Sequence, residues 1–279
     1  MKIPKKIIIL ALSLIIIIIF FTCFYSKTPT NETYFLQLDS YMGYMEDEDI
    51  AIQLPFIVTH EAQNKIEFSS VTILSEGINI AEEISAQMLG SSETDYSLYT
   101  LVVSLNFPSP GIYSFDNVTL TTAANEKHTY NIGNWTIEIK KGSNPPDIDL
   151  QQACTMLGVF ERYTIEIKNL SHNTINIENI YALLEKHSVS TTIFSGSDYD
   201  AAVGNQSNDL SLKSGATKGF SFEFDVISVP QDSKNSFVCL KPFLVYEINN
   251  QKKYMSLPET NYSPPLDDDE IKNLILALQ

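Results

Sequence analysis

The stretch Trp135-Thr136-Ile137-Glu138-Ile139-Lys140 alternates large apolar residues with polar ones. Because successive side chains of a β-strand point to opposite faces of a sheet, this period of two predicts a strand with one buried and one solvated face. Strands of this kind are typical of antiparallel sheets that cover a core on one side. Trp135, the only tryptophan, falls on the apolar face. We therefore expect it in the core rather than in a ligand platform.

The same period continues through residues 31–142. The odd-numbered residues from 99 to 107 form an apolar face, for example. Pro55 interrupts another run and indicates an edge strand or a bulge, because proline cannot donate to a hydrogen-bond ladder. The segment 78–88 fits either a strand or one or two helical turns. Short strands at this density predict a β-sandwich domain, with about seven strands near 34–42, 48–59, 66–75, 78–88, 97–107, 111–122 and 128–141.

A linker separates this region from a second one. Residues 141–147 read Lys-Gly-Ser-Asn-Pro-Pro-Asp, a composition typical of a short, semi-rigid domain boundary. Alternating strands resume beyond it, around Ile165 and around Phe222, and predict a second antiparallel β-sandwich domain over residues 147–260. The run 237–248 is apolar on both faces, which predicts one central strand shielded on two sides.

A short amphipathic helix is predicted at the C-terminus, over residues 266–279. Its apolar residues recur at helical spacing, and the acidic residues that precede them suit a helix N-terminus. A helix of this length is marginal alone. We therefore expect it to dock, most simply on the second domain and otherwise on a partner.

Residues 1–25 combine Lys2, Lys5 and Lys6 with an almost unbroken apolar run. This order predicts a membrane-targeting segment with the bulk of the chain on the extracytoplasmic side. The apolar run, 7–25, is long enough to remain as a transmembrane helix. Residues 1–23 also resemble a bacterial lipoprotein signal, which implies a lipid on Cys23, although Phe20-Phe21-Thr22 departs from the usual residues before the cysteine. Secretion after simple cleavage is a third alternative.

Charge excludes one class of partner. The formal net charge is −16, and Arg162 is the only arginine. Nucleic acid and anionic lipid headgroups attract clustered Lys or Arg, so we expect neither to be bound by the acidic exterior.

A turn with a following tyrosine adds fold information. Residues 108–115 read Pro-Ser-Pro-Gly-Ile-Tyr-Ser-Phe, and this stretch resembles the tyrosine corner of immunoglobulin-like domains. The resemblance implies that the Tyr113 hydroxyl binds upstream backbone. In the second region, residues 165–177 together with Lys213-Ser214-Gly215 resemble immunoglobulin-like domains of bacterial surface proteins. That resemblance implies an Asn-containing hairpin between two early strands.

Cysteines and carboxylates are the remaining candidate sites. In an exterior compartment Cys154 and Cys239 can form a disulfide, but two buried free thiols fit the sequence equally. Calcium needs several converging oxygens. The candidate ligands are Asp147, Asp149, Asp198 and Asp200, and the alternative is that these are solvated acidic loops. The acidic stretch 46–49 is a further carboxylate cluster.

No motif indicates catalysis. The chain has no HExxH, CxxC, GxSxG or glycine-rich phosphate-binding pattern. We therefore expect an all-β, non-enzymatic, membrane-tethered binding or accessory envelope protein with a protein partner and no required cofactor. The alternatives are an exported hydrolase whose carboxylates converge only in space, and a structural spacer.

Overall fold

A computed structural model describes residues 33–59, 68–88, 96–154, 162–184, 189–198, 202, 209–226, 237–262 and 268–278. The predicted membrane-targeting segment, with Cys23, lies outside these residues, and so does Asp200. No helix within the described ranges is long and apolar enough to cross a membrane.

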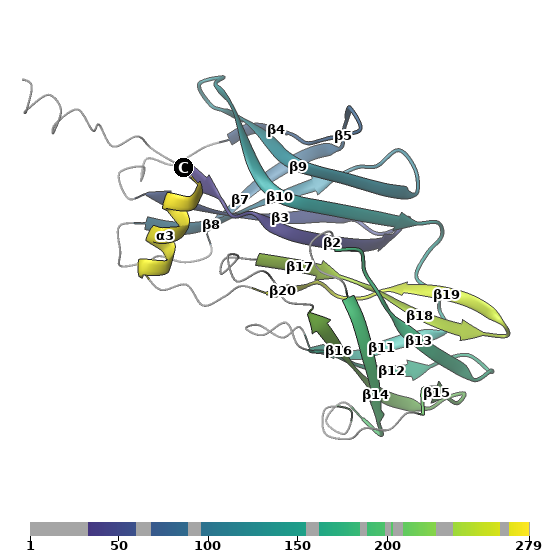
Figure 1. Ribbon diagram of the computed structural model, residues 1–279. Coiled ribbons are helices and arrows are strands. Elements are labelled where there is room, and N and C mark those ends of the chain that lie inside the picture. Colours follow the sequence, from purple (N-terminus) through teal and green to yellow (C-terminus); the bar gives the residue numbers. More distant parts are fainter. Residues whose placement is uncertain are drawn as a thin grey trace, which may run out of the picture.

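The first sandwich consists of two sheets, called sheet A and sheet B below (Figure 1). Sheet A has the order β1-β3-β8-β7, with β1 (Thr33–Phe35), β3 (Ile50–Thr59), β8 (Tyr96–Leu105) and β7 (Ala81–Met88). Sheet B has the order β20-β17-β2-β10-β9-β4, with β20 (Thr260–Tyr262), β17 (Phe237–Lys241), β2 (Leu38–Met45), β10 (Lys127–Lys140), β9 (Gly111–Thr122) and β4 (Phe68–Thr72). A two-stranded hairpin, β5 (Leu74–Ser75) and β6 (Ile78–Asn79), lies beside β9.

The second sandwich also has two sheets. Sheet D has the order β11-β12-β16-β14, with β11 (Ile148–Cys154), β12 (Arg162–Asn169), β16 (Thr217–Val226) and β14 (Val189–Gly196). Sheet E has the order β15-β13-β18-β19, with β15 (Ser211–Leu212), β13 (Ile175–Tyr181), β18 (Phe243–Ile248) and β19 (Gln251–Ser256). The prediction of a mostly β chain is therefore confirmed. The expectation of antiparallel sheets is wrong for β2, which pairs in parallel with β10 and with β17.

Alternation along the strands builds the first core. Trp135 is 1% exposed, its ring stacks on Phe115 at a centroid distance of 6.1 Å, and its Nε1 donates to the carbonyl of Ile132 at 3.1 Å. Residues of sheets A and B share one apolar cluster, the first core. The prediction that Trp135 is a core residue is confirmed.

β2 is buried on both faces. All eight of its residues are buried. Leu38, Met42 and Tyr44 belong to the first core, whereas Tyr41 and Met45 belong to a second apolar cluster, the second core, inside the second sandwich. Because strand side chains alternate, β2 contributes side chains to both cores, and we call it the shared wall of the two sandwiches.

Sheet B also contains two strands from the end of the chain. β17 pairs in parallel with β2, with Cys239 opposite Ser40, and β20 pairs with β17. The range 147–260 predicted for the second domain therefore supplies one strand to the first sandwich, β17, and the first residue of another, β20. The run 237–248 was predicted as one central strand, which is wrong, because it forms β17 and β18 in different sheets on either side of Pro242. The expected burial on both faces holds for β17, whose Cys239 joins the first core and whose Leu240 joins the second.

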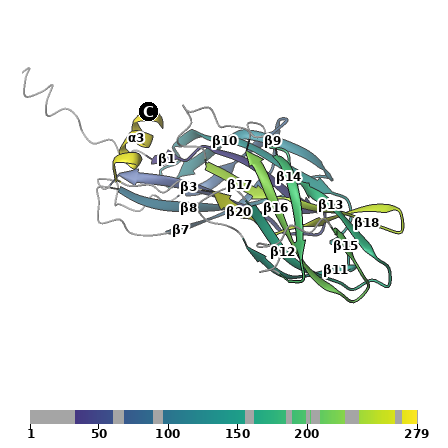
Figure 2. The same cartoon turned by 60° about the horizontal axis from the view of Figure 1, so that its bottom comes forward.

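The C-terminal helix is present as α3 (Asp268–Leu278). Leu274 is 4% exposed and belongs to the first core, and Ile271, Ile275 and Leu278 pack against the same core. The preferred prediction, docking on the second domain, is therefore wrong. Figures 1 and 2 both show α3 at the end of the first sandwich that is remote from the second.

Three further differences concern single strands. The predicted strand 34–42 is divided between β1 and β2, which lie in different sheets. The ambiguous segment 78–88 is extended and contains β7. β12 and β13 do not form the expected hairpin, because one lies in sheet D and the other in sheet E. Asn169, which is 0% exposed, holds the connecting turn by donating to the carbonyl of Asn173 at 2.7 Å.

Candidate functional sites between and beside the two sandwiches

Of the aspartates predicted as calcium ligands, Asp147, Asp149 and Asp198 are described. The Asp147 carboxylate accepts a bond from Lys253 Nζ at 2.5 Å. Asp149 is exposed on β11, whereas Asp198 follows β14, at the opposite edge of sheet D. Among the described residues no group of three or more His, Cys, Asp or Glu side chains could hold a metal ion. Asp147 instead forms an ion pair that joins the linker to β19.

Tyr113 makes the contact that the tyrosine-corner resemblance implies. Its hydroxyl donates to the backbone carbonyl of Ser109 at 2.6 Å, where the chain passes from β8 in sheet A to β9 in sheet B. Its ring also lies 4.6 Å from that of Phe107, measured between centroids. The side chain therefore closes the turn at a crossing between sheets.

Cys239 lies in the first core, is 2% exposed and has no disulfide partner among the side chains that the structure describes. Its Sγ donates to Glu259 Oε1 at 3.5 Å. Burial raises the pKa of the thiol well above its usual value, and the neighbouring carboxylate adds to this shift. The side chain of Cys154 lies outside the described residues, so the distance between the two sulfurs is undefined. The disulfide therefore stays a prediction.

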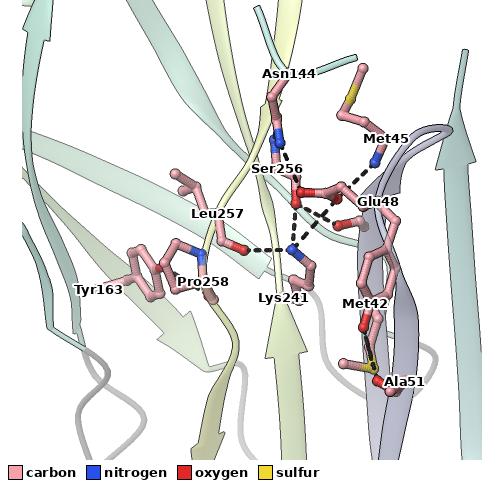
Figure 3. A network of polar contacts seen from close by, with 12 residues as sticks. Met42, Met45, Glu48, Ala51, Asn144, Tyr163, Lys241, Ser256, Leu257 and Pro258 are labelled. Atoms are coloured by element: carbon pink, nitrogen blue, oxygen red, sulfur yellow. Dashed lines mark hydrogen bonds and ion pairs between the residues drawn. The ribbon is translucent and has the colours of Figure 1, made fainter. Parts of the chain in front are cut away.

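Lys241, the last residue of β17, is the centre of a polar network between the sandwiches (Figure 3). Its side chain is 13% exposed. The ammonium donates to Ser256 Oγ at 2.5 Å and to the carbonyl of Leu257 at 3.2 Å, and it lies 3.7 Å from Glu48 Oε2. Burial lowers the pKa of Lys241 below its usual value, and the carboxylate of Glu48 opposes this shift.

Glu48 and Asn144 complete the Lys241 network. Glu48 Oε2 accepts from the backbone N–H of Met45 at 2.9 Å, and Oε1 accepts from Asn144 Nδ2 at 2.8 Å. Asn144 Oδ1 in turn accepts from the backbone N–H of Ser256 at 2.9 Å (Figure 3). The linker, the turn after β2, and β17 and β19 are thereby joined through side chains. Buried charges need such partners, because leaving one without a partner costs several kcal/mol in general.

A second buried ion pair lies on the outer face of sheet B. Lys140 pairs with Glu138, and the Lys140 ammonium lies over three rings of the second sandwich, at 4.2 Å from the centroid of Tyr254, 5.1 Å from Phe243 and 5.3 Å from Tyr181. A cation over aromatic faces is attracted by the ring quadrupoles. Lys140 therefore links the first sandwich to the second.

Glu138 of this ion pair also binds a buried tyrosine, Tyr41. The Tyr41 hydroxyl donates to Glu138 Oε2 at 2.8 Å, and its ring meets that of Tyr181 edge-on. Burial raises the pKa of Tyr41 far above its usual value, with a further contribution from the Glu138 carboxylate. The neutral phenol is therefore the form that the fold requires.

A cavity of about 620 Å³ lies between the outer face of sheet B and the segment after β13. Ser114 and Asp116 of β9, Asn134 and Thr136 of β10, and Leu183 of the second sandwich are among its lining residues. Ile112, also in the lining, is 54% exposed. This cavity therefore combines hydroxyl, amide, carboxylate and aliphatic groups.

A smaller cavity, about 360 Å³, has an acidic lining. Glu46, Glu48 and Asp49 come from the turn between β2 and β3, and Glu82 comes from β7. Three of these carboxylates are already hydrogen-bonded: Glu48 in the Lys241 network, Glu46 to the Gly142 N–H at 3.2 Å, and Glu82 to Asn106 at 2.7 Å. The acidic stretch noted in the sequence thus contributes to a cavity, and Glu82 is the member that the sequence did not indicate.

These features define the class of protein, an all-β chain with two sandwiches joined through one sheet. No protein-family model and no curated protein matches the sequence.

Solved structures show only remote likeness. The Yersinia pseudotuberculosis adhesin InvE is 10% identical, with 84% of this chain and 59% of that chain covered and a TM-score of 0.22. A membrane-anchored protein from Corynebacterium diphtheriae is 14% identical, with 86% and 60% covered and a TM-score of 0.23. Fibronectin(III)-like modules of Clostridium thermocellum CbhA are 9% identical, with 85% and 94% covered and a TM-score of 0.25. The chain thus spans less than two thirds of the first two proteins, and TM-scores this low carry no argument.

Proposed function

We propose that this chain is a membrane-tethered, extracytoplasmic protein that acts by binding, with its two sandwiches working as one rigid body. The observation that carries the proposal is the two-sided burial of β2, which makes sheet B a wall of both cores. Independent domains joined by a linker move relative to one another by default. Two units that share a wall hold any surface they carry at a fixed distance and orientation, which suits a binding or accessory role.

The ion pairs where the two sandwiches meet support a structural role for these charged side chains. Lys241 pairs with Glu48 and Lys140 with Glu138 within sheet B and its turns, and both lysines also contact the second sandwich, at Ser256 and Tyr254. Asp147 of the linker pairs with Lys253 of β19. A catalytic acid or base instead needs a carboxylate or amine that faces a substrate. Binding without catalysis is therefore the simpler role for this part of the molecule.

The tether rests on the sequence. Residues 7–25 have the length and composition of a retained helix, and Cys23 offers the alternative of a lipid anchor. Either anchor leaves the acidic bulk of the chain outside, where its net negative charge keeps it from anionic headgroups.

Fractionation and surface digestion test the tether. We expect the full chain in the membrane fraction and its tagged C-terminus to be cut by protease added to intact cells. Incorporation of a palmitate analogue that is lost in Cys23→Ala identifies a lipid anchor, whereas membrane retention of that variant without labelling identifies the helix. Recovery of the chain in the cytosolic or culture fraction contradicts the tether.

Cross-linking on intact membranes tests the binding role. A partner recovered with the wild type, and lost on substitution of surface residues such as Ile112→Asp beside the larger cavity, supports it. A matched exposed position away from that cavity, Leu170→Asp, is the control, since Leu170 is 52% exposed. No partner at any exposed site favours a structural spacer.

A hydrolase is the second candidate, because the smaller cavity is lined by more than two carboxylates. General acid and base catalysis by a carboxylate pair is a common way to cleave glycosidic bonds. Turnover of glycoside or peptide substrates that is lost in Glu82→Gln and retained in Glu76→Gln, an exposed glutamate outside the cavity, supports this role. The absence of turnover across such substrates contradicts it.

A further inference from the structure

The larger cavity, beside the outer face of sheet B, is built around a β-bulge in β10. Pairing between β10 and β9 is regular on both sides of the bulge, and its register shifts between Asn131 and Trp135. Asp116 of β9 and Asn134 of β10 both fall within this interval, and both line the cavity. β-Bulges redirect side chains and are common beside functional sites. The bulge therefore brings an amide and a carboxylate into the lining of one cavity.

Gly133 fixes the shape of this bulge. Its φ is 86°, a value that side chains with a Cβ rarely adopt, and an added Cβ would lie 2.1 Å from the carbonyl oxygen of Leu38. Its N–H donates to Asn131 Oδ1 at 2.9 Å. The bulge thus has a defined conformation before any ligand binds, which lowers the entropic cost of binding.

Two hydroxyl groups lie beside the bulge. Ser114 and Thr136 are directly opposite each other on β9 and β10, and both line the cavity. The side chains of Ser114, Thr136 and Asn134 make no hydrogen bond with any residue that the structure describes. A hydroxyl can both donate and accept, and an amide carries two donors and an acceptor. These three side chains are therefore available to a ligand that has several hydroxyl groups.

Aliphatic side chains complete the lining. Ile112 of β9 is 54% exposed, and Leu183, which follows β13, is 38% exposed. Sites for small ligands commonly combine an apolar lining with a few placed polar groups. Ile112 and Leu183 offer contact to the C–H face of a ligand whose hydroxyl groups bind at the bulge.

Charge narrows the class of ligand. Among the described residues that line the cavity, Asp116 is the one carboxylate, and none is a lysine, arginine or histidine. This carboxylate and the formal net charge of −16 repel phosphates and carboxylates. A hard cation needs several converging oxygens, and Asp116 Oδ1 already accepts from Asn117 Nδ2 at 2.6 Å. A neutral ligand rich in hydroxyl groups therefore fits this lining best.

We propose that the larger cavity is a carbohydrate-binding site for a neutral sugar. The hydroxyl groups of a pyranose ring pair with Asn134, Asp116 and the two hydroxyl side chains. A volume of about 620 Å³ lies within the usual range for small-ligand sites. The proposal rests on the rigid body of the proposed function, because Ile112 and Leu183 belong to different sandwiches and a fixed joint keeps them at one distance.

Calorimetric titration of the full chain with sugars tests the proposal. The detergent must have no sugar headgroup, because an alkyl glycoside would compete for the site. The neutral probes are glucose, galactose, N-acetylglucosamine, cellobiose and lactose, and glucosamine and glucuronate are the cationic and anionic comparisons. We expect at least one neutral sugar to bind saturably, with a Kd on the order of 1 mM, and glucuronate to bind more weakly than that sugar.

Two variants locate the site. Asn134→Ala should raise the Kd of the bound sugar at least about tenfold, because it removes donors and an acceptor together. Thr136→Val keeps the shape of the side chain and is remote from the glycine of the bulge, and it should raise the Kd about three- to tenfold at an unchanged melting temperature. Asn176→Ala is the matched control, since Asn176 is an exposed strand residue on β13 outside the cavity lining.

Three results would overturn the proposal. The first is the failure of every neutral sugar to bind, and a single melting transition in the same sample would then leave the proposed rigid body intact. The second is tighter binding of glucosamine or glucuronate than of any neutral sugar, or equal affinity for the wild type and both cavity variants. The third is a cross-linked protein partner that is lost in Ile112→Asp while the wild type binds no sugar, which would assign the cavity to protein contact.

Discussion

The two sandwiches are assembled from the chain in different ways. The second takes a nearly continuous stretch, β11 to β16, and adds the hairpin of β18 and β19. The first takes strands from residues 33–140 and then β17, β20 and α3 from the last part of the chain. The chain therefore crosses between the two units several times after residue 226. The first sandwich is therefore complete only after the chain has passed through the strands of the second.

The wall between them is thin where β2 meets β18. A Cβ atom added at Gly43 would lie 2.5 Å from Cε2 of Phe243, whose ring is fully buried. Ser256 Oγ donates to the Gly43 carbonyl at 3.1 Å at the same place. The Phe243 ring approaches the backbone at Gly43 so closely that only glycine fits there. The two sandwiches are therefore packed against each other as closely as the residues within one core.

The largest expected effect follows from separating the units. A chain limited to residues 26–146 lacks β17, β20 and α3, and it exposes Tyr41 and Met45, which are 0% and 5% exposed in the intact fold. Each such side chain loses about 1.5–3 kcal/mol of burial. We expect this fragment to show no cooperative thermal transition, whereas residues 26–279 should melt in one step by calorimetry. A sharp transition in the fragment would show that the sandwiches are independent.

High pH is expected to have the next largest effect. Burial raises the pKa of Tyr41 on the second-core face of β2 and of Tyr44 on the first-core face, both from an ordinary value of 10.0. A group whose folded pKa is raised holds its proton more tightly in the native state. Its stabilising contribution is complete below about pH 10 and is lost as pH rises further.

Melting temperatures between pH 8 and pH 11 measure this loss. We expect a steep fall above pH 10 that affects probes in both sandwiches together, since both tyrosines stand on one strand. Tyr44→Phe removes one of the ionising groups, so its curve should fall less steeply than that of the wild type. Separate transitions for the two sandwiches at pH 11 would contradict a shared wall.

α3 provides the third comparison between the units. Leu274 is 4% exposed in the first core, and Leu276, two residues later, is 68% exposed. Leu274→Ala should lower the free energy of unfolding by about 2–3 kcal/mol, and Leu276→Ala should change it by less than about 0.5 kcal/mol. Equal effects in denaturant titrations would place α3 elsewhere. If the units are coupled, a reporter in the second sandwich will follow the Leu274→Ala transition.

The contrast between α3 and the strands shows what the sequence could predict. The period of two in β10 and the helical spacing around Leu274 are local, so both elements could be predicted along with their apolar faces. The surface that receives α3 is assembled from distant segments, and nothing in the helix itself specifies it. Its docking site was therefore missed, although the docking itself was expected.

β17 illustrates a signal that was present but not used. The pairing of Cys239 with Ser40 joins residues about two hundred positions apart in the sequence. The apolar run 237–248 has the same pattern whether its strands lie in sheet B or in sheet E, so the pattern alone does not assign them. Pro242 was the local indication, because proline cannot donate to a ladder and divides the run in two. Lys241 was another, since a charged residue in an apolar run requires a partner, and its partner Glu48 lies in the acidic stretch noted in the sequence.

The Lys241 network tests the joint itself. Lys241→Met keeps most of the apolar stem but removes the ammonium, which leaves Glu48 without its cation. We expect a loss of about 1–2 kcal/mol in the free energy of unfolding. Glu48→Gln in the same background should recover part of that loss, because the uncompensated charge is then absent. Additive effects in this double-mutant cycle, measured by urea titration, would show that the two side chains do not interact.

The smallest expected effect concerns a contact that lies wholly within the first sandwich. Tyr113→Phe removes the 2.6 Å bond to the Ser109 carbonyl and leaves the ring on Phe107. A hydrogen bond of this kind contributes about 0.5–1.5 kcal/mol, and the exposed turn keeps the value near the lower end because water can replace the hydroxyl. The variant should retain one melting transition at a slightly lower temperature. Two transitions would mean that this corner, rather than the shared wall of β2, couples the sandwiches.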